Sequence, residues 1–351
     1  MSGFAHGNKQ FGRLAKKGGN TMKKLLSLVL VSAMLLFSAA AMADVELLIG
    51  TQETGTAGYT YATAIMQCIQ TIPGYSVSLV SNSSGNVTSP VLIQEGECDL
   101  TVSNSAPALW ATTTGVESAS LPVCPDVRCI AGGLGKDFIN VMFTQSFVDK
   151  IGIKTIEELV EKKQPVRMII KKNGSFGELA AERVFGVFGI DINNAPEWLT
   201  VEKTSGGAIK DGLSDDLYDL TIDHIGSGQA NTTELCLNHA MYDVQLADST
   251  LEALCAQGYD YVTVPAGTWN GQNVDIKTVG SQQCIIVSAD MDEEVAYNIT
   301  KALCENREIL VNTSAVLANF NPEVSGSKAL TGCELHPGAA RYYQEMGYAF
   351  N

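Results

Sequence analysis

Positive charge is scarce in this sequence. Its 351 residues include 23 Lys and Arg against 38 Asp and Glu, which gives a formal net charge of −15. Residues 1–43 contain six of the basic residues and no acidic one, so the rest of the chain has 17 against 38, or −21. Such an acidic surface repels phosphate-rich partners. We therefore exclude nucleic acid and anionic membranes as partners.

The motifs of several enzyme and cofactor classes are also missing. The sequence has no Cys-x-x-Cys or Cys/His cluster with zinc spacing, no Rossmann or Walker fingerprint and no Gly-x-Ser-x-Gly elbow. The three histidines after residue 43 lie in no recognisable triad. We expect no metal, no cofactor and no enzymatic activity, and an exported hydrolase or transferase on the same scaffold is the less favoured alternative.

Long apolar runs are absent beyond the N-terminal region. Met22-Lys23-Lys24 precedes the run Leu25 to Phe37, and Ala41-Met42-Ala43 follows. This order is typical of a cleavable secretory signal, and the run is too short to span a bilayer. We expect a signal peptide over residues 1–43, cleavage before Asp44 and a periplasmic mature protein without membrane insertion. Met22 is a second candidate start.

Nine cysteines follow the leader, in a compartment where disulfides persist. Cys124 and Cys129 bracket a short turn, and Cys236 and Cys255 flank a helical region, so these are the preferred pairs. The odd number leaves at least one thiol free or paired with another molecule, and spacing leaves the full connectivity open.

The stretch from Val45 to Ile69 predicts a strand, a loop and a helix. Residues 45–49 form a short apolar run, and residues 50–59 form a loop of small and hydroxyl-bearing residues. Ala62, Ile65, Met66 and Ile69 then follow the spacing of an amphipathic helix. The free N–H groups at such a helix start favour a carboxylate or another anion.

The same construction recurs along the chain. Strands predicted over residues 75–80, 100–102 and 166–170 each deliver a polar loop, and the strand beginning at residues 218–222 delivers His224 and residues 226–229. Further strands are predicted over residues 129–131, 141–143, 262–264 and 284–287. In open α/β sheets, ligands bind outside the carboxyl ends of the strands. Two α/β lobes with such loops predict a ligand held in the cleft between them.

Two later motifs make the chain resemble a known family. They are Val264-Pro265-Ala266-Gly267-Thr268-Trp269-Asn270-Gly271-Gln272 and Leu335-His336-Pro337-Gly338-Ala339-Ala340-Arg341-Tyr342-Tyr343. Together with the opening strand–loop–helix and the Gly174-Ser175 loop, they resemble the TAXI family of extracytoplasmic solute receptors, which serve TRAP-type transporters. The opening loop departs from the family pattern, because Gly58 and Tyr59 stand where two tyrosines are usual.

The resemblance implies an α/β, two-lobed periplasmic-binding-protein fold of the class II type. It also implies a small carboxylate ligand, an organic acid or an acidic amino acid such as glutamate, and a membrane permease as partner. We expect residues 44–135 and 279–351 to form lobe I and residues 140–275 to form lobe II, with two crossings. A ligand-sensing receptor that docks on a sensor kinase is the alternative reading.

The candidate ligand-binding residues lie in the strand-tip loops. Asn173, Gly174 and Ser175 are the first choice for binding a carboxylate, with plain helix capping by Ser175 as the alternative. Tyr59 is equally interpretable as a packed aromatic. His336 is expected to be structural, and Trp269 is expected to be either a hinge residue or a core aromatic. The full candidate set is Thr54, Gly55, Thr56, Tyr59, Asn82, Ser84, Asn86, Asn104, Ser105, Asn173, Gly174, Ser175 and Gln229, with His224 as a weaker member.

Overall fold

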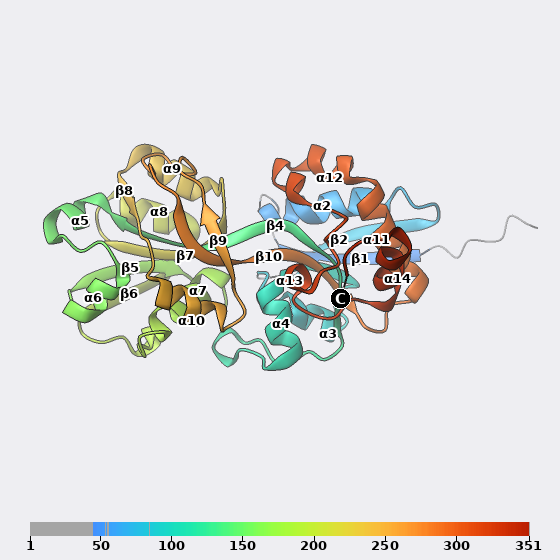
Figure 1. The fold of residues 1–351 in the computed structure, drawn as a ribbon, viewed down its shortest axis with the longest axis horizontal. Coiled ribbons are helices and arrows are strands. Elements are labelled where there is room, and N and C mark those ends of the chain that lie inside the picture. Colours follow the sequence, from blue (N-terminus) through green and yellow to red (C-terminus); the bar gives the residue numbers. More distant parts are fainter. Residues whose placement is uncertain (1–44, 53, 55, 84, 351) are drawn as a thin grey trace, which may run out of the picture. The chain divides into compact units, whose positions relative to one another are not determined.

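The computed structural model describes residues 45–350 apart from 53, 55 and 84, so the predicted signal peptide lies outside it. Figure 1 shows the described strands and helices. The strands are β1 (Val45–Thr51), β2 (Tyr75–Ser81), β3 (Leu100–Asn104), β4 (Val127–Thr144), β5 (Val166–Lys171), β6 (Leu199–Thr204), β7 (Leu220–Gly226), β8 (Met241–Asp243), β9 (Asp260–Val264) and β10 (Ile276–Ser288).

The longer helices follow the strands in α/β fashion. They are α2 (Ala57–Ile69), α3 (Ser89–Gln94), α4 (Ser105–Thr113), α5 (Gln145–Ile151), α6 (Ile156–Lys162), α7 (Phe176–Gly186), α8 (Gly206–Ser214), α9 (Ala230–Asn238), α10 (Asp248–Cys255), α11 (Glu293–Glu305), α12 (Arg307–Thr313), α13 (Lys328–Thr331) and α14 (Pro337–Met346). Three short 3₁₀ turns cover Glu117–Ala119, Ile192–Asn194 and Ala315–Asn319.

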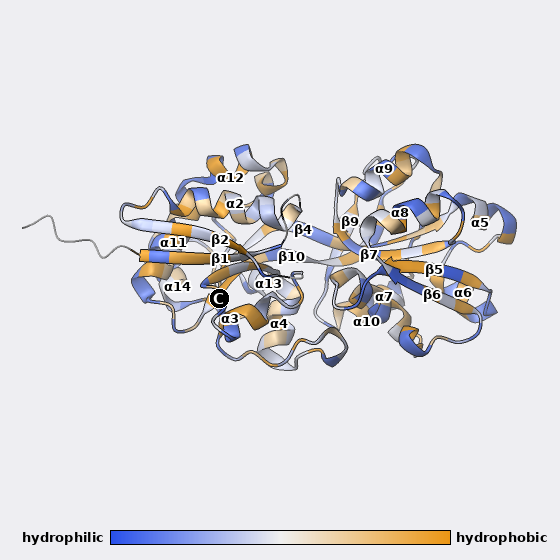
Figure 2. Cartoon of the chain, turned by 180° about the vertical axis from the view of Figure 1, so that it is seen from behind, coloured by the Kyte–Doolittle hydropathy of each residue, from blue (hydrophilic) through white to orange (hydrophobic). Residues whose placement is uncertain are grey.

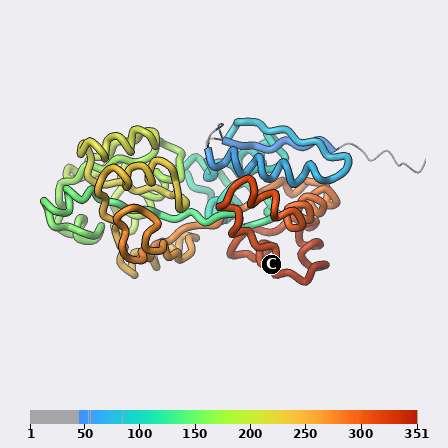
Figure 3. The backbone as a smooth tube through the Cα atoms, turned by 90° about the horizontal axis from the view of Figure 1, so that it is seen from above, coloured from blue at the N-terminus to red at the C-terminus, as the bar shows by residue number. Residues whose placement is uncertain are grey.

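The hydrogen bonds join the strands in the order β2-β1-β3-β10-β4-β7-β5-β6, with β8 on β4 and β9 on β10. β1 and β3 are parallel, as are β5 and its neighbours β6 and β7, whereas β10 and β4 are antiparallel to the strands they meet. In Figure 3 the N-terminal segment (blue) and the C-terminal segment (red) lie at the same end. The edge strand β6 is hydrophilic, and β1 is largely hydrophobic (Figure 2).

The two long strands β4 and β10 lie in the middle of the sheet order, and each pairs with different strands along its length. β10 pairs with β9 over residues 276–280 and with β3 over residues 283–287. β4 pairs with β10 over residues 127–138 and with β7 from Asp137 to Phe143. The predicted strands 129–131 and 141–143 are therefore parts of one strand, and 284–287 is the end of another. β4 and β10 pair with each other, so all ten strands form one hydrogen-bonded sheet.

Periodic apolar residues build the core as their spacing indicates. In α2, Ala62, Ile65 and Ile69 are buried, and Met66 is partly buried. Trp269 is 2% exposed and packs with Phe138, Met142 and other apolar side chains of one cluster, so it is a core aromatic. Burying each such side chain contributes about 1.5–3 kcal/mol. His336 is buried and caps α14 by accepting a hydrogen bond from the Gly338 N–H, a structural role as expected.

The preferred disulfides are not formed, because all nine cysteines are free thiols. Cys236 packs in the core cluster that contains Trp269, whereas Cys255 interacts with Tyr261. Cys129 lies inside β4, beside Cys284 of β10. Burial raises the pKa of eight of the nine thiols. Sequence spacing was a poor guide here because it does not fix the direction of a side chain.

A methyl group at Gly280 tests the close approach of β10 to β4. A Cβ there would lie 2.0 Å from the Asp137 carbonyl oxygen and 2.8 Å from the Phe138 Cα. We expect Gly280→Ala to lower the free energy of unfolding by about 1–3 kcal/mol or more, measured by urea unfolding. The matched control is Gly186→Ala at the end of α7, where a Cβ meets nothing within 4 Å. It should stabilise by about 0.4–1 kcal/mol. Equal urea midpoints for Gly280→Ala and the parent would contradict the close approach.

Candidate functional site

A pocket of about 420 Å³ lies where the strand tips and the two crossing strands meet. The β1–α2 turn contributes Gln52, Ala57 and Gly58, and the β5–α7 turn contributes Ser175, Phe176 and Gly177. The remaining walls come from the β2–α3 loop, from β3, β4 and β5, from β7 and the β7–α9 loop, and from β10. Their residues include Gly85, Asn86, Asn104, Asp137, Lys171, Asp223, His224, Gln229 and Gln283, together with Tyr61 of α2.

Two helix N-termini open onto this pocket. Ala57 and Gly58 are the first residues of α2, and Phe176 and Gly177 are the first residues of α7. The caps are Thr56, whose Oγ1 accepts from the Tyr59 N–H, and Ser175. First-turn N–H groups have no partner within their own helix, and the helix dipole is positive there. This part of the pocket favours a carboxylate.

The Ser175 hydroxyl is engaged within its own helix. Its Oγ accepts a hydrogen bond from the Glu178 N–H at 3.1 Å, and the Glu178 carboxylate accepts one from the Gly174 N–H at 2.6 Å. Lys203 forms an ion pair with Glu178. This is a capping arrangement, in which the Gly174 N–H already has the Glu178 carboxylate as its hydrogen-bond acceptor. Ser175 lines the pocket as a helix cap.

Asp137, in the middle of β4, is held by two amides. Its Oδ2 accepts from Gln283 Nε2 at 2.9 Å and from Asn104 Nδ2 at 3.2 Å. Asn86 Nδ2 donates in turn to Asn104 Oδ1 at 2.8 Å, which fixes the orientation of the Asn104 amide. Burial raises the pKa of Asp137, while the hydrogen bonds from Gln283 and Asn104 act in the opposite direction.

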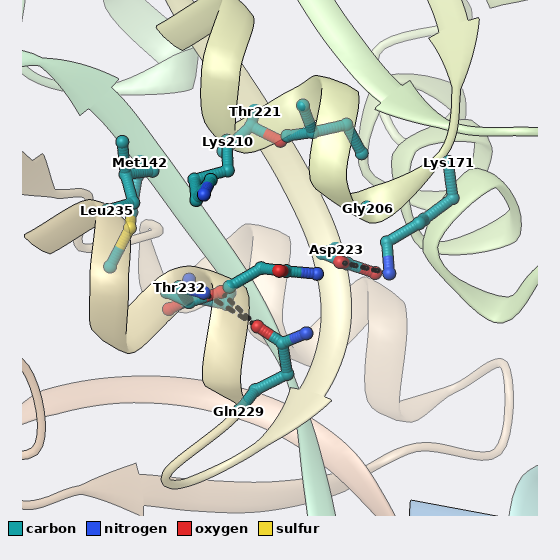
Figure 4. A pocket seen from close by; sticks show the side chains of 12 residues that line it. Met142, Lys171, Gly206, Lys210, Thr221, Asp223, Gln229, Thr232 and Leu235 are labelled. Carbon is teal, nitrogen blue, oxygen red and sulfur yellow. Dashed lines mark hydrogen bonds and ion pairs between the residues drawn. The ribbon is translucent and has the colours of Figure 1, made fainter. Parts of the chain in front are cut away.

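Lys171 and Asp223 form an ion pair on another wall, with Nζ and Oδ2 3.3 Å apart. A Cβ at Gly177 would lie 2.2 Å from Asp223 Oδ1, so only glycine lets the α7 start approach this pair. Burial raises the pKa of Asp223, and the charge of Lys171 opposes the rise. Figure 4 shows Lys171 and Asp223 pointing toward one another beside a second cavity of about 20 Å³, room for roughly one water.

His224 is a buried neutral aromatic in this wall. Its ring stacks on Phe176 with centroids 3.6 Å apart, and its Nε2 lies 3.4 Å from the Ser281 hydroxyl. Burial lowers the pKa of His224 to about 3. A base this weak does not take a proton from a serine at neutral pH, and Ser281 is fully buried. The pair is a buried hydrogen-bonded contact within this wall.

Several predicted site residues meet in the pocket. Asn86, Asn104, Ser175, Gln229 and the weaker candidate His224 line it. Gln229 caps α9, where its Oε1 accepts from the Thr232 N–H at 2.7 Å. These residues come from four separate loops or strand tips, as the recurring strand–loop–helix pattern predicted.

Other predicted residues lie outside the pocket wall, as far as the described residues define it. Thr54 and Asn173 are exposed, Thr56 caps α2, and Ser105 Oγ accepts from the Gln282 N–H at 3.1 Å. Asn82 Nδ2 donates to the Glu97 carbonyl at 3.4 Å. Tyr59 is replaced on the wall by Tyr61, because the α2 helix turns the two side chains in different directions. The remaining members are Gly174, whose N–H donates to Glu178, and Gly55 and Ser84, which lie outside the described residues.

The charged and amide residues of β4, β7 and β10 were missed from the sequence. Asp137, Asp223 and Gln283 each lie in a strand most of whose residues are buried. A polar side chain inside a buried strand is itself a signal, because burial of an unpaired polar group is costly. Attention to such positions identifies these residues without a structure.

Comparison with known proteins identifies the family. The model of the NMT1-like family matches residues 49–347. The chain belongs to the NMT1-like family. MatC from Rhodopseudomonas palustris, solved with bound malate, is 12% identical with a TM-score of 0.51, and the match covers 87% of this chain and 99% of MatC. This likeness confirms the predicted α/β, two-lobed periplasmic-binding-protein fold.

Two further solved structures resemble this NMT1-like protein. A TctC solute binding protein from Polaromonas, without ligand, is 12% identical with a TM-score of 0.49 and covers 88% of this chain and 99% of its own. XAC2383 from Xanthomonas citri, bound to a chloride ion, is 11% identical with a TM-score of 0.48 and covers 86% and 95%. No helix in the described part of the chain is both long and apolar enough to cross a membrane. Over the same residues, no group of His, Cys, Asp and Glu could hold a metal ion.

The buried His224 makes the free energy of unfolding depend on pH. In the unfolded chain this histidine takes up a proton near pH 6.5, whereas in the folded chain it does so only near 3. Its contribution to stability is therefore lost as the pH falls from 6.5 towards 3, by up to about 1.4 kcal/mol per pH unit. We expect His224→Gln to lack this loss. The measurement is the difference in free energy of unfolding between the two proteins from pH 7 to pH 5. Parallel curves would contradict it.

Proposed function

We propose that this chain is an extracytoplasmic solute receptor of the TAXI type, which binds a small carboxylate and delivers it to a TRAP-type membrane permease. The ligand is an organic acid or an acidic amino acid such as glutamate, held in the pocket at the strand tips. The protein acts in the periplasm after removal of residues 1–43, and it performs no catalysis.

The observation that supports this proposal most is the meeting of the α2 and α7 starts in one pocket. Two sets of first-turn N–H groups offer a carboxylate hydrogen bonds from opposite parts of the chain. The pocket volume of about 420 Å³ is within the range of small-molecule sites. MatC, with the same fold, was solved with bound malate, a small carboxylate.

The points where the long strands β4 and β10 change partners support a division into two lobes. We propose that residues 44–135 and 279–351 form lobe I and residues 140–275 form lobe II. β4 changes partner near Asp137, and β10 changes partner between Gly280 and Gln283. The α2 start then belongs to lobe I and the α7 start to lobe II, so a ligand that touches both favours closure.

A ligand screen followed by replacement of Lys171 tests whether the pocket binds carboxylates. A thermal-shift screen of organic acids and amino acids, on protein refolded from denaturant, should reveal a ligand with micromolar or tighter affinity, about −8 kcal/mol. Lys171→Gln leaves Asp223 uncompensated beside the α7 start, and we expect it to weaken binding by about tenfold or more in calorimetry.

Lys210→Gln is the matched control for Lys171→Gln. Lys210 forms an ion pair with Glu234 at 2.7 Å and does not line the larger pocket, so its replacement should leave affinity unchanged. A screen without any carboxylate ligand would overturn the proposed function. Equal affinities of the parent and Lys171→Gln would show that the ligand carboxylate is not bound at the α7 start.

Binding should be accompanied by closure of the two lobes. The ligand contacts groups from both, and its higher affinity for the closed arrangement drives the change. We expect small-angle scattering to show a smaller radius of gyration at saturating ligand than in its absence. Replacement by Ala of Asn104 on the lobe I side, or of Ser175, whose cap holds the α7 start on the lobe II side, should weaken binding and reduce the compaction. An unchanged radius at saturation would favour contacts from one lobe only.

A further inference from the structure

We propose that Asp137 receives a cationic group of the ligand, so that the solute is an amino acid and not a simple organic acid. This inference rests on the proposed function, because it assigns a second subsite within the same pocket. The first subsite takes the carboxylate, and the second takes an ammonium or a similar nitrogen cation. Three observations carry it: the charge balance of the wall, the hydrogen bonds of Asp137 and the space beside its second oxygen.

The charge balance of the pocket favours a cation near Asp137. Lys171 is the cation of the described lining, and it is already paired with Asp223. Among the ion pairs formed by the described residues, none includes Asp137. A carboxylate enclosed by protein without a cationic partner is costly. A purely anionic solute would add a second negative charge beside it, whereas an ammonium group would neutralise it.

The hydrogen bonds of Asp137 leave one oxygen for a ligand. Gln283 and Asn104 both donate to Oδ2, and Asn104 and Gln283 are 0% and 5% exposed, so the carboxylate is held by rigid neighbours. Among the described residues, no hydrogen bond to Asp137 Oδ1 is formed. Two amide donors thus fix the carboxylate plane and keep the other oxygen available as an acceptor.

Gly226 keeps the space beside that oxygen open. A Cβ at this position would lie 2.9 Å from Asp137 Oδ1, and Gly226 itself lines the pocket. The glycine belongs to β7, whereas Asp137 belongs to β4, and the two residues face each other in the sheet register. Any side chain here would cover the oxygen that the ligand needs. Gly226, Asp137 and the helix starts thus make a site that is negative on one wall and positive on others, as a zwitterion requires.

The experiment compares amino acids with their deaminated counterparts. Calorimetry on the mature, refolded protein would use L-glutamate against glutarate, L-aspartate against succinate and L-leucine against 4-methylpentanoate. Within each pair that binds, the amino acid should bind at least about 30-fold more tightly, the value of a hydrogen bond to a charged group. Asp137→Asn keeps the shape of the side chain and removes its charge, and it should abolish most of this preference.

Asp243→Asn is the matched control, because this partly buried acid of β8 lies away from the pocket lining. It should keep the preference of the parent. Equal or tighter binding of the deaminated member by the parent, or an undiminished preference in Asp137→Asn, would overturn the inference and leave the proposed function intact. If no carboxylate in any pair binds, both the inference and the proposed function are contradicted. The comparison within each pair on the parent protein tests whether the ligand is an amino acid. This test does not depend on whether Asp137→Asn folds.

Discussion

β4 and β10 pair with one another over residues 127–138 and 280–288, and each remaining strand attaches to one of them directly or through a neighbour. This pairing sets the position of the pocket. Asp137 and Ser281 face each other in its register, Gln283 follows two residues later, and Asn104 lies opposite Gln283 on β3. The amide–carboxylate cluster is thus a direct product of strand register. A shift of one residue would turn these polar side chains to the other face of the sheet.

The strongly negative charge of the protein and the proposed carboxylate ligand are compatible, because surface charges and pocket groups act over different distances. The net charge of −15 describes a surface whose charges are screened beyond about 8–10 Å at physiological salt. Inside the pocket, the helix starts of α2 and α7 present N–H groups at hydrogen-bonding range. In the proposed site, those local dipoles together with Lys171 select the ligand. Net charge accordingly excludes nucleic acid but does not predict the sign of a small ligand.

The repeating strand–loop–helix units and the α/β class could be predicted from the sequence, because apolar period and small-residue loops are local properties. Local reasoning also found Asn86, Asn104, Ser175 and Gln229, which follow predicted strands. It could not tell Tyr59 from Tyr61, since helix phase near a cap decides which ring reaches the pocket. It also missed that residues 129–131 and 141–143 belong to one strand, because the glycines between them are typical of a loop. The cysteine pairs failed for a related reason: spacing gives proximity in sequence and not direction in space.

The same glycines connect the architecture to closure. The extra residues of two irregularities lie on β4. Its residues 133–135, which include Gly133 and Gly135, lie opposite Gln283 alone, and the register shifts again between Ile285 and Ile286. Bulges weaken local pairing and increase twist, and they concentrate near binding sites. Gln283 lies inside the first irregularity and donates to Asp137 across it. A change in the angle between the ends of the sheet therefore acts on the strand that holds the Asp137 carboxylate.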